Sequence, residues 1–319
     1  MATSEQILSL IKSHIDGDND RFKTLALQLS VAEAKAGHTV FSRAIKDLLT
    51  KSNLRVFRPT FKQLSADISE YLLLGKDDAT MASLVISKAI EDKIKRIILE
   101  YIQREKLQKY NLENRHKVLL YGPSGTGKTM SASVIANELH LPLYIVRLEK
   151  IVTKFMGETS LKLSKVFDCI SQLPGVYLFD EFDAIGHQRG YDNEVGEMRR
   201  VLNTFLQLME RESSNSIIVA ATNDVESLDK ALFRRFDDVI EYQLPEIPVI
   251  ERLIENTFVD FKLIGKINEL SQLLKGRSCA DIVEICRDAI KSHILDNMEL
   301  SVSNIISLID SRTNICKIG

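Results

Sequence analysis

The chain has 319 residues, a net charge of −2 at pH 7 and ordinary shares of apolar and charged side chains. This length favours two domains, one of which can bury a full hydrophobic core. The near-neutral charge gives no reason to expect a nucleic-acid partner, and no apolar run approaches the ~18 residues of a membrane-spanning helix. The first residues lack the basic region of a signal peptide. The four cysteines show no metal-ligand spacing. We therefore expect a cytoplasmic protein with reduced cysteines and no membrane contact.

Apolar residues recur at helical spacing in three stretches of the first fifty residues. The three stripes are Ile7, Leu8, Ile11 and Ile15; Phe22, Leu25, Ala26 and Leu29; and Val40, Phe41, Ala44, Ile45, Leu48 and Leu49. Each such helix buries one face, so we expect a small all-α N-terminal region over residues 1–52. Residues 53–81, which include Arg58-Pro59-Thr60, give mixed signals and are predicted to form a linker.

Five short apolar runs alternate with helical patterns after residue 82. They are VLLYG at 118–122, LYIVRL at 143–148, VYLFD at 176–180, SIIVAA at 216–221 and VIEYQL at 239–244, and a long helix at about 87–108 precedes them. Buried strands that alternate with helices predict an α/β subdomain over residues 82–245, with a parallel sheet covered on both faces. Residues 246–319 contain only helical patterns, at 249–259, 266–275, 279–297 and 302–310. They predict a helical subdomain after the α/β one.

The run VLLYG leads directly into GPSGTGKT, which matches the G-x-x-x-x-G-K-[ST] pattern between a strand and a helix. Its glycines allow a tight turn whose N–H groups point at phosphate oxygens, and the following helix adds its positive end. Lys128 would reach the β- and γ-phosphates, and the Thr129 hydroxyl would bind Mg²⁺. A glycine-rich turn without a ligand is the alternative. The pattern predicts a site for ATP and Mg²⁺ formed by Gly122, Pro123, Ser124, Gly125, Thr126, Gly127, Lys128, Thr129 and Met130.

Polar residues end two other apolar runs. Asp180 and Glu181 follow VYLF, at the carboxyl end of a strand, where α/β sheets bind ligands. Asp180 can hold the Mg²⁺ shell, and Glu181 can orient and deprotonate the attacking water. Asn223 ends the run SIIVAATN and can hydrogen-bond that water or the γ-phosphate, although an Asn after a strand is usually a turn residue.

GPSGTGKT, VYLFDE, AATN at 220–223 and the helical tail together resemble the AAA-type ATPase module, over about residues 82–319. The resemblance is to the classical AAA branch. It implies a P-loop NTPase in which a five-stranded parallel sheet is followed by a C-terminal α-helical lid, with the nucleotide between them. In the same way, GRSCADI at 276–282 resembles the lid turn that packs against adenine. This implies that Ala280 contacts the base, opposite the segment Leu84 to Ile86, while Cys279 stands where many members have glycine.

LFRRFDD at 232–238 resembles the arginine-finger segment of the family. The resemblance implies that Arg234 and Arg235 act in the site of a neighbouring subunit. The Pro-Gly that many members carry between the two arginines is missing here, so which arginine contributes more stays open. The resemblance therefore also implies a homo-oligomeric ring, most often a hexamer in the family.

The stretch TKFMGETS at 153–160 places two large apolar residues in a predicted loop, before a helix expected to begin near Thr159. KFMGE resembles the pore-loop pattern of the family. This implies that Phe155 grips an extended polypeptide, with adaptable contact from Met156 and a bend at Gly157. The alternative is that Phe155 and Met156 fold back into the core. Residues 190–194 are a candidate second, polar pore loop.

Together these features predict an ATP-hydrolysing motor that assembles into a ring and remodels or unfolds protein substrates. Whole-chain similarity suggests a bacterial branch, some members of which are paired with a subtilisin-like protease in phage defence, so a protease partner is one hypothesis. A nucleic-acid loader is a second, which the near-neutral composition and the apolar loop disfavour. A switch that controls a partner by slow hydrolysis is a third, which the intact Asp180–Glu181 pair disfavours.

Overall fold

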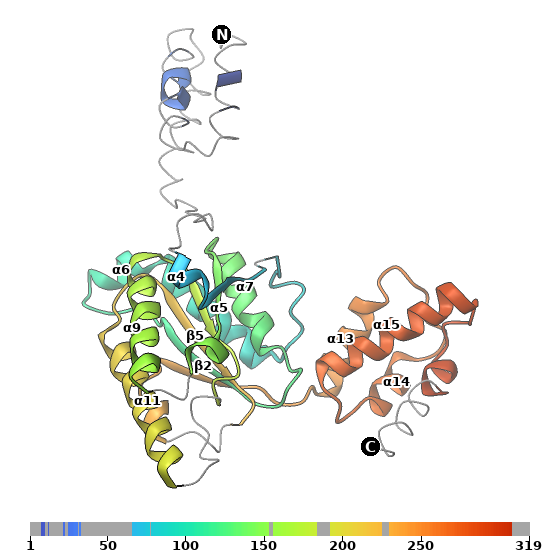
Figure 1. Cartoon of the computed structure of the whole chain (residues 1–319). Coiled ribbons are helices and arrows are strands. Elements are labelled where there is room, and N and C mark those ends of the chain that lie inside the picture. Colours follow the sequence, from blue (N-terminus) through green and yellow to red (C-terminus); the bar gives the residue numbers. More distant parts are fainter. Residues whose placement is uncertain are drawn as a thin grey trace. The chain divides into compact units, whose positions relative to one another are not determined.

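A computed structural model describes residues 8–9, 12, 22, 25–30, 32, 66–76, 78–152, 156–183, 192–224 and 230–307 (Figure 1). The side chains of 66, 156–157, 192–200 and 230–231 are not among the described ones. The chain divides into two compact units, Met1–Phe57 and Arg58–Gly319. No helix within these described ranges combines the length and the apolar character needed to cross a membrane.

The described residues of the N-terminal unit are helical. Ala26 is buried and Leu25 and Leu29 are half-buried, while Leu27 is exposed, as the predicted second stripe requires. Leu8 is 65% exposed, so this member of the predicted first stripe does not contribute to a core. The predicted third stripe lies outside the described residues.

The C-terminal unit alternates helices and strands and then continues with helices only. Its elements in chain order are α4 (Ala66–Ser69), β1 (Leu72–Leu74), α5 (Lys88–Ile102), α6 (Arg104–Gln108), β2 (Lys117–Tyr121), α7 (Lys128–Glu138), β3 (Leu143–Val146), α8 (Leu148–Ile151), α9 (Met156–Gln172), β4 (Val176–Phe179), α11 (Asp192–Arg211), β5 (Ile217–Thr222), α12 (Lys230–Phe233), β6 (Asp238–Glu241), α13 (Ile247–Thr257), α14 (Ile267–Leu273) and α15 (Cys279–Asp296). Residues 302–307 are also helical. The long helix predicted at 87–108 is therefore two helices, because α5 ends before Gln103.

The strands form one mixed sheet in the order β1-β3-β4-β5-β2-β6. All neighbouring strands pair in parallel except β1, which runs antiparallel to β3. The expectation of five strands, all parallel, is corrected by this sixth edge strand. β1 lies within residues 53–81, where the sequence predicts a linker. Its three leucines are too short a run to show a period, and only Leu72, opposite Val146, is buried.

Side chains that alternate along the strands divide the core of the sheet into two layers. In β2, Val118 and Leu120 pack with α5 and α7 on one face of the sheet, whereas Leu119 packs with α9 and α11 on the other. Residues at alternate positions of a strand point to opposite faces, and both faces here are covered by helices. The central strands are therefore buried throughout, and their ends are the part of the sheet that can meet a ligand.

The helices after the sheet have a core of their own, formed by α13, α14, α15 and residues 302–307. Val85 belongs to this core, while its neighbours Leu84 and Ile86 belong to the core of the sheet. The segment before α5 therefore connects the two cores, because successive side chains in an extended segment point in opposite directions.

Candidate active site

The strand order brings three predicted site segments to one edge of the sheet. β5 lies between β4 and β2, with Ala220 opposite Phe179 and Thr222 opposite Tyr121. The loop 122–127, the pair Asp180-Glu181 and Asn223 each follow the last residue of one of these strands. Because the carboxyl ends of parallel strands lie at the same edge, residues about 100 positions apart in the sequence meet there.

The loop before α7 depends on its glycines. Gly122, Gly125 and Gly127 have φ values of +136°, +73° and +103°, in the region that favours glycine. A Cβ atom on Gly122 would lie 1.9 Å from the carbonyl oxygen of Tyr242, and one on Gly125 would lie 2.6 Å from Ser278 Oγ. The backbone therefore approaches β6 and α15 more closely than any side chain would allow.

Lys128 is the first residue of α7 and is only 6% exposed. Its Nζ donates hydrogen bonds of 2.7 Å to the carbonyl oxygens of Gly122 and Pro123, so the ammonium group lies against the loop. Burial lowers the pKa of Lys128, while the nearby carboxylates of Asp180 and Asp183 act in the opposite direction. A phosphate group in the loop would offer this buried cation a further negatively charged partner.

A direct contact joins the loop helix to β4. Thr129 Oγ1 donates a hydrogen bond of 2.7 Å to Asp180 Oδ2, although the two residues are 51 positions apart. Glu181, the next residue, is exposed and has a left-handed φ of +51°, and its N–H donates to Asp180 Oδ1 at 3.0 Å. A strained backbone at a non-glycine residue is frequent at functional sites. Here the left-handed conformation of Glu181 turns the chain sharply after β4. The turn brings the N–H of Phe182, the next residue, to the carbonyl oxygen of Ala221 in β5, at 2.8 Å.

Asn223 is exposed directly after β5. Beside it lies a residue that the sequence did not single out, Asp183, whose Oδ1 accepts a 2.9 Å hydrogen bond from Thr222 Oγ1. Thr222 Oγ1 also accepts a 3.2 Å hydrogen bond from the N–H of Asp224. These contacts hold the turn that carries Asn223 against the segment after β4. The only available sequence signal was that Asp183 is the third acid of DEFD.

The start of α15 contacts the loop. Ala280 N–H donates a 3.0 Å hydrogen bond to Gly125 O, which places this predicted base-contacting residue beside the loop. The helix start is itself well defined, because Ser278 and Asp281 form a reciprocal capping box. Burial raises the pKa of the Cys279 thiol to about 11, so this cysteine is a neutral thiol at physiological pH.

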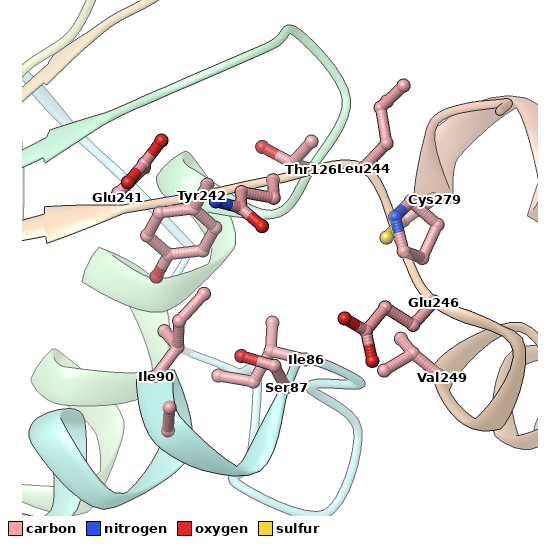
Figure 2. Close-up of a pocket in the computed structure, with 13 residues that line it drawn as sticks. Ile86, Ser87, Ile90, Thr126, Glu241, Tyr242, Leu244, Glu246, Val249 and Cys279 are labelled. Carbon is pink, nitrogen blue, oxygen red and sulfur yellow. The ribbon is translucent and has the colours of Figure 1, made fainter.

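A cavity of about 420 Å³ opens beside this contact (Figure 2). It is lined by Ile86, Ser87, Ala89, Ile90, Thr126, Glu241, Tyr242, Gln243, Leu244, Pro245, Glu246, Val249 and Cys279. Ile86 and Cys279 come from the two segments that the sequence predicted around a base, and Thr126 comes from the predicted phosphate loop. Leu84 is not among the lining residues, but it lies with Ile86 against Gly127.

A second cavity, of about 460 Å³, adjoins the two acids. Leu73 of the edge strand β1 and Val152 after α8 belong to its lining, together with Asp180 and Glu181. Asp180 is half-buried and Glu181 is exposed, so neither acid belongs to the core of the sheet.

The arginine segment lies at the opposite end of the sheet. Arg234 and Arg235 are exposed, and Arg235 forms an ion pair with Glu210 near the end of α11. Asp237 N–H bonds to the carbonyl oxygen of Lys117, the first residue of β2. The loop Gly122–Thr129 follows the last residue of β2, roughly 16 Å away at 3.3 Å per residue. The arginine segment therefore lies at the end of the sheet away from the loop of its own chain.

The predicted polypeptide-gripping residues are only partly described. Phe155 lies outside the described residues. Met156 and Gly157 form the first turn of α9, so the helix begins three residues before the expected Thr159. Likewise, residues 192–194 already belong to α11, which corrects the predicted second loop at its C-terminal side.

Comparisons with known proteins agree with this arrangement. Residues 118–244 match the family described as "ATPase family associated with various cellular activities (AAA)". An "Uncharacterized AAA family ATPase y4kL" of Sinorhizobium fredii is 31% identical over 304 residues, which cover 93% of this chain and 91% of that protein.

Other relatives match over less of their length. A "Putative 26S proteasome regulatory subunit homolog" of Methanothermobacter thermautotrophicus is 31% identical over 71% of this chain and 59% of its own. A "Proteasome-activating nucleotidase" of Saccharolobus solfataricus is 36% identical over 56% of this chain and 48% of its own. The crystal structure of the FIGL-1 AAA domain has the same fold, with a TM-score of 0.62 and 21% identity over 79% of this chain and 90% of that domain.

Proposed function

The chain belongs to the AAA family of ATPases, and on that basis we propose that it hydrolyses ATP with Mg²⁺ at the loop Gly122–Thr129, as a subunit of a ring that remodels protein substrates. One observation carries the chemistry. Thr129 and Asp180, the two residues expected to hold Mg²⁺, are joined by a 2.7 Å hydrogen bond. A hydroxyl and a carboxylate are oxygen ligands of the kind that Mg²⁺ prefers, so the residues fit the ion.

The side chains at this edge have separate tasks in the proposed reaction. Lys128, now bonded to two loop carbonyls, would transfer its hydrogen bonds to the β- and γ-phosphate oxygens. Glu181 would accept a proton from the attacking water, which its exposed position after β4 permits. Asn223 would orient that water or the γ-phosphate. Mg²⁺, when bound, would neutralise charge on the phosphates. The cavity between Ile86, Thr126 and Cys279 would take the base, beside Ala280.

The arginines support a ring. Arg234 and Arg235 lie at the end of the sheet away from their own loop, so they would act in the site of a neighbouring copy. There a guanidinium group would stabilise negative charge that develops on the transferring phosphoryl group. A homo-oligomer that closes in this head-to-tail manner is a ring, and we propose a hexamer.

Polypeptide is the substrate that we propose. The aromatic, hydrophobic and glycine residues Phe155, Met156 and Gly157 would grip it, between β3 and α9. Two of the relatives are named after the proteasome, as a regulatory subunit homolog and as a proteasome-activating nucleotidase. Those names support a partner protease that receives the unfolded chain.

The experiment that tests this function uses Glu181→Gln, which should bind ATP and stall. The full-length variant is purified from cells with ATP, beside a double variant that also carries Phe155→Ala, and the co-purifying material is identified. We expect assorted proteins with the first variant and few with the second. Nucleic acid would instead indicate a loader, and a single partner that ignores Phe155→Ala would indicate a switch. Lys128→Ala, which should not bind ATP, is the control for nonspecific capture.

A further inference from the structure

One carboxylate attaches the arginine segment to the strand that carries the nucleotide loop. Asp237 Oδ2 accepts hydrogen bonds from the backbone N–H groups of His116 and Lys117, both at 2.9 Å. The N–H of Asp237 donates in return to Lys117 O at 2.8 Å. All three bonds connect Asp237, which follows Arg235 by two positions, with the beginning of β2.

These bonds fix the orientation of the arginine segment as well as its position. Hydrogen bonds from backbone N–H groups to a carboxylate are charge-assisted and stronger than those between neutral groups. Two donors on one oxygen, with a third bond from the main chain, leave the turn little freedom to rotate about β2. The neighbouring carboxylate of Asp238 is different, because its partners are the side chains of Arg115 at 3.0 Å and Lys93 at 3.3 Å.

The other end of the same strand pair is attached to the nucleotide loop. β6 pairs in parallel with β2, and Tyr242 N–H, just after β6, donates to Tyr121 O at 2.7 Å. The buried Tyr242 hydroxyl forms a 2.6 Å hydrogen bond with Ser131 of α7. The ladder of β2 and β6 therefore joins the nucleotide loop at one end to the arginine segment at the other.

We propose that Asp237 is a positioning residue, which holds Arg234 and Arg235 in the orientation that reaches the site of the neighbouring copy. This inference rests on the proposed role of the two arginines between subunits. Asp237 itself touches no phosphate. It acts by keeping the arginine turn in register with β2, and so with the nucleotide loop of its own chain.

The expected effect is on turnover rather than on ATP binding. A misplacement of about 1 Å can reduce a reaction rate about 100-fold, so Asp237→Ala should slow steady-state hydrolysis by roughly that factor. ATP affinity should not change, because the loop lies at the other end of β2. Asp237→Asn keeps a carbonyl oxygen that can accept both N–H groups, and it should restore most of the rate.

The test is a double-mutant cycle on the full-length, assembled protein. Turnover and affinity for a fluorescent ATP analogue are measured for Asp237→Ala, for the double variant Arg234→Ala with Arg235→Ala, and for all three changes together. We expect the triple variant to be no slower than the double one, because a misplaced arginine and a missing one fail in the same step. Asp238→Asn is the matched control. Its effect on turnover should be small, and combining it with the double arginine variant should reduce turnover by the product of the two separate factors.

Each contrary result has a distinct meaning. If the double arginine variant hydrolyses ATP at the normal rate, the proposed arginine function is wrong, and the positioning role with it. If that variant is slow but Asp237→Ala is normal, or if the two losses multiply, only the role of Asp237 is wrong. Should Asp237→Ala fail to fold, Asp237→Glu serves instead, since it keeps the charge but displaces the turn by one methylene. Normal turnover of Asp237→Glu would contradict the proposal.

Discussion

The two ends of the sheet are built in different ways. At the carboxyl ends of β2, β4 and β5, the loop Gly122–Thr129 makes its own shape from glycines with positive φ, and its lysine bonds to carbonyls in the same loop. At the other end, the arginine segment is held by the carboxylate of Asp237, which is bonded to the start of β2, far away in the sequence. The first end holds the parts for binding. The second end is the one that we propose to act in the site of another copy. The predictions below separate these two ends, from the largest expected effect to the smallest.

Lys128→Ala should give the largest effect. The variant should lose ATP binding and turnover together. Lys128 is the only cationic residue of the loop Gly122–Thr129, and it is buried, so no other cation of the loop can replace it at the phosphates. Binding of a fluorescent ATP analogue measures this directly. Undiminished affinity would show that the loop does not hold the phosphates.

Replacing the arginines singly should affect only catalysis. Arg234→Ala should slow turnover by about 10³-fold in the assembled protein, with ATP affinity unchanged. Arg235→Ala should have the smaller effect, because Arg235 is paired with Glu210, whereas Arg234 has no ion-pair partner among the described residues. Steady-state ATPase assays at saturating protein concentration compare the two. The reverse order would assign the main role to Arg235.

Gly122→Ala should act on folding at the binding end. The change forces a Cβ atom into the carbonyl oxygen of Tyr242 at a φ of +136° and should reduce the free energy of unfolding by about 3 kcal/mol. Gly276→Ala is the matched control, since its φ is also positive, at +86°, but a Cβ atom there would meet no non-neighbouring atom of the described residues within 4 Å. It should cost about 1 kcal/mol. Thermal melting of both variants measures the difference, and equal losses would mean that the close approach to β6 is not required.

Tyr242→Phe should give the smallest effect and tests the connection between the two ends. It removes one buried hydrogen bond, to Ser131 Oγ, which keeps its own 3.0 Å bond to Gly127 O. The expected loss is about 1 kcal/mol of unfolding free energy, with a small decrease in ATP affinity. Chemical denaturation and analogue binding report the two quantities. A large loss of turnover at normal ATP affinity would show that the Tyr242 hydroxyl contributes more than Asp237 to the connection between the nucleotide loop and the arginine segment.

Much of the binding end was predictable from local sequence. The apolar runs of the five parallel strands fall where the sequence placed them, because strands covered on both faces are apolar throughout. The edge strand β1 escaped prediction, because a run of three leucines carries no period and its pairing partner β3 lies 70 residues away. The start of α9 at Met156 was also missed, since Gly157 favours a turn over a helix in any local estimate.

The sequence by itself determined which chemistry the chain carries, because a phosphate loop is a property of consecutive residues: glycines where φ must be positive and a lysine where its helix begins. Only the tertiary structure decided what surrounds that loop. The bond from Thr129 to Asp180, the role of Asp183 beside Thr222, and the attachment of Asp237 to the start of β2 each join residues 39 to 120 positions apart. Such contacts depend on strand order and register, which no local pattern encodes, and they set the positions of the groups that the motifs supply.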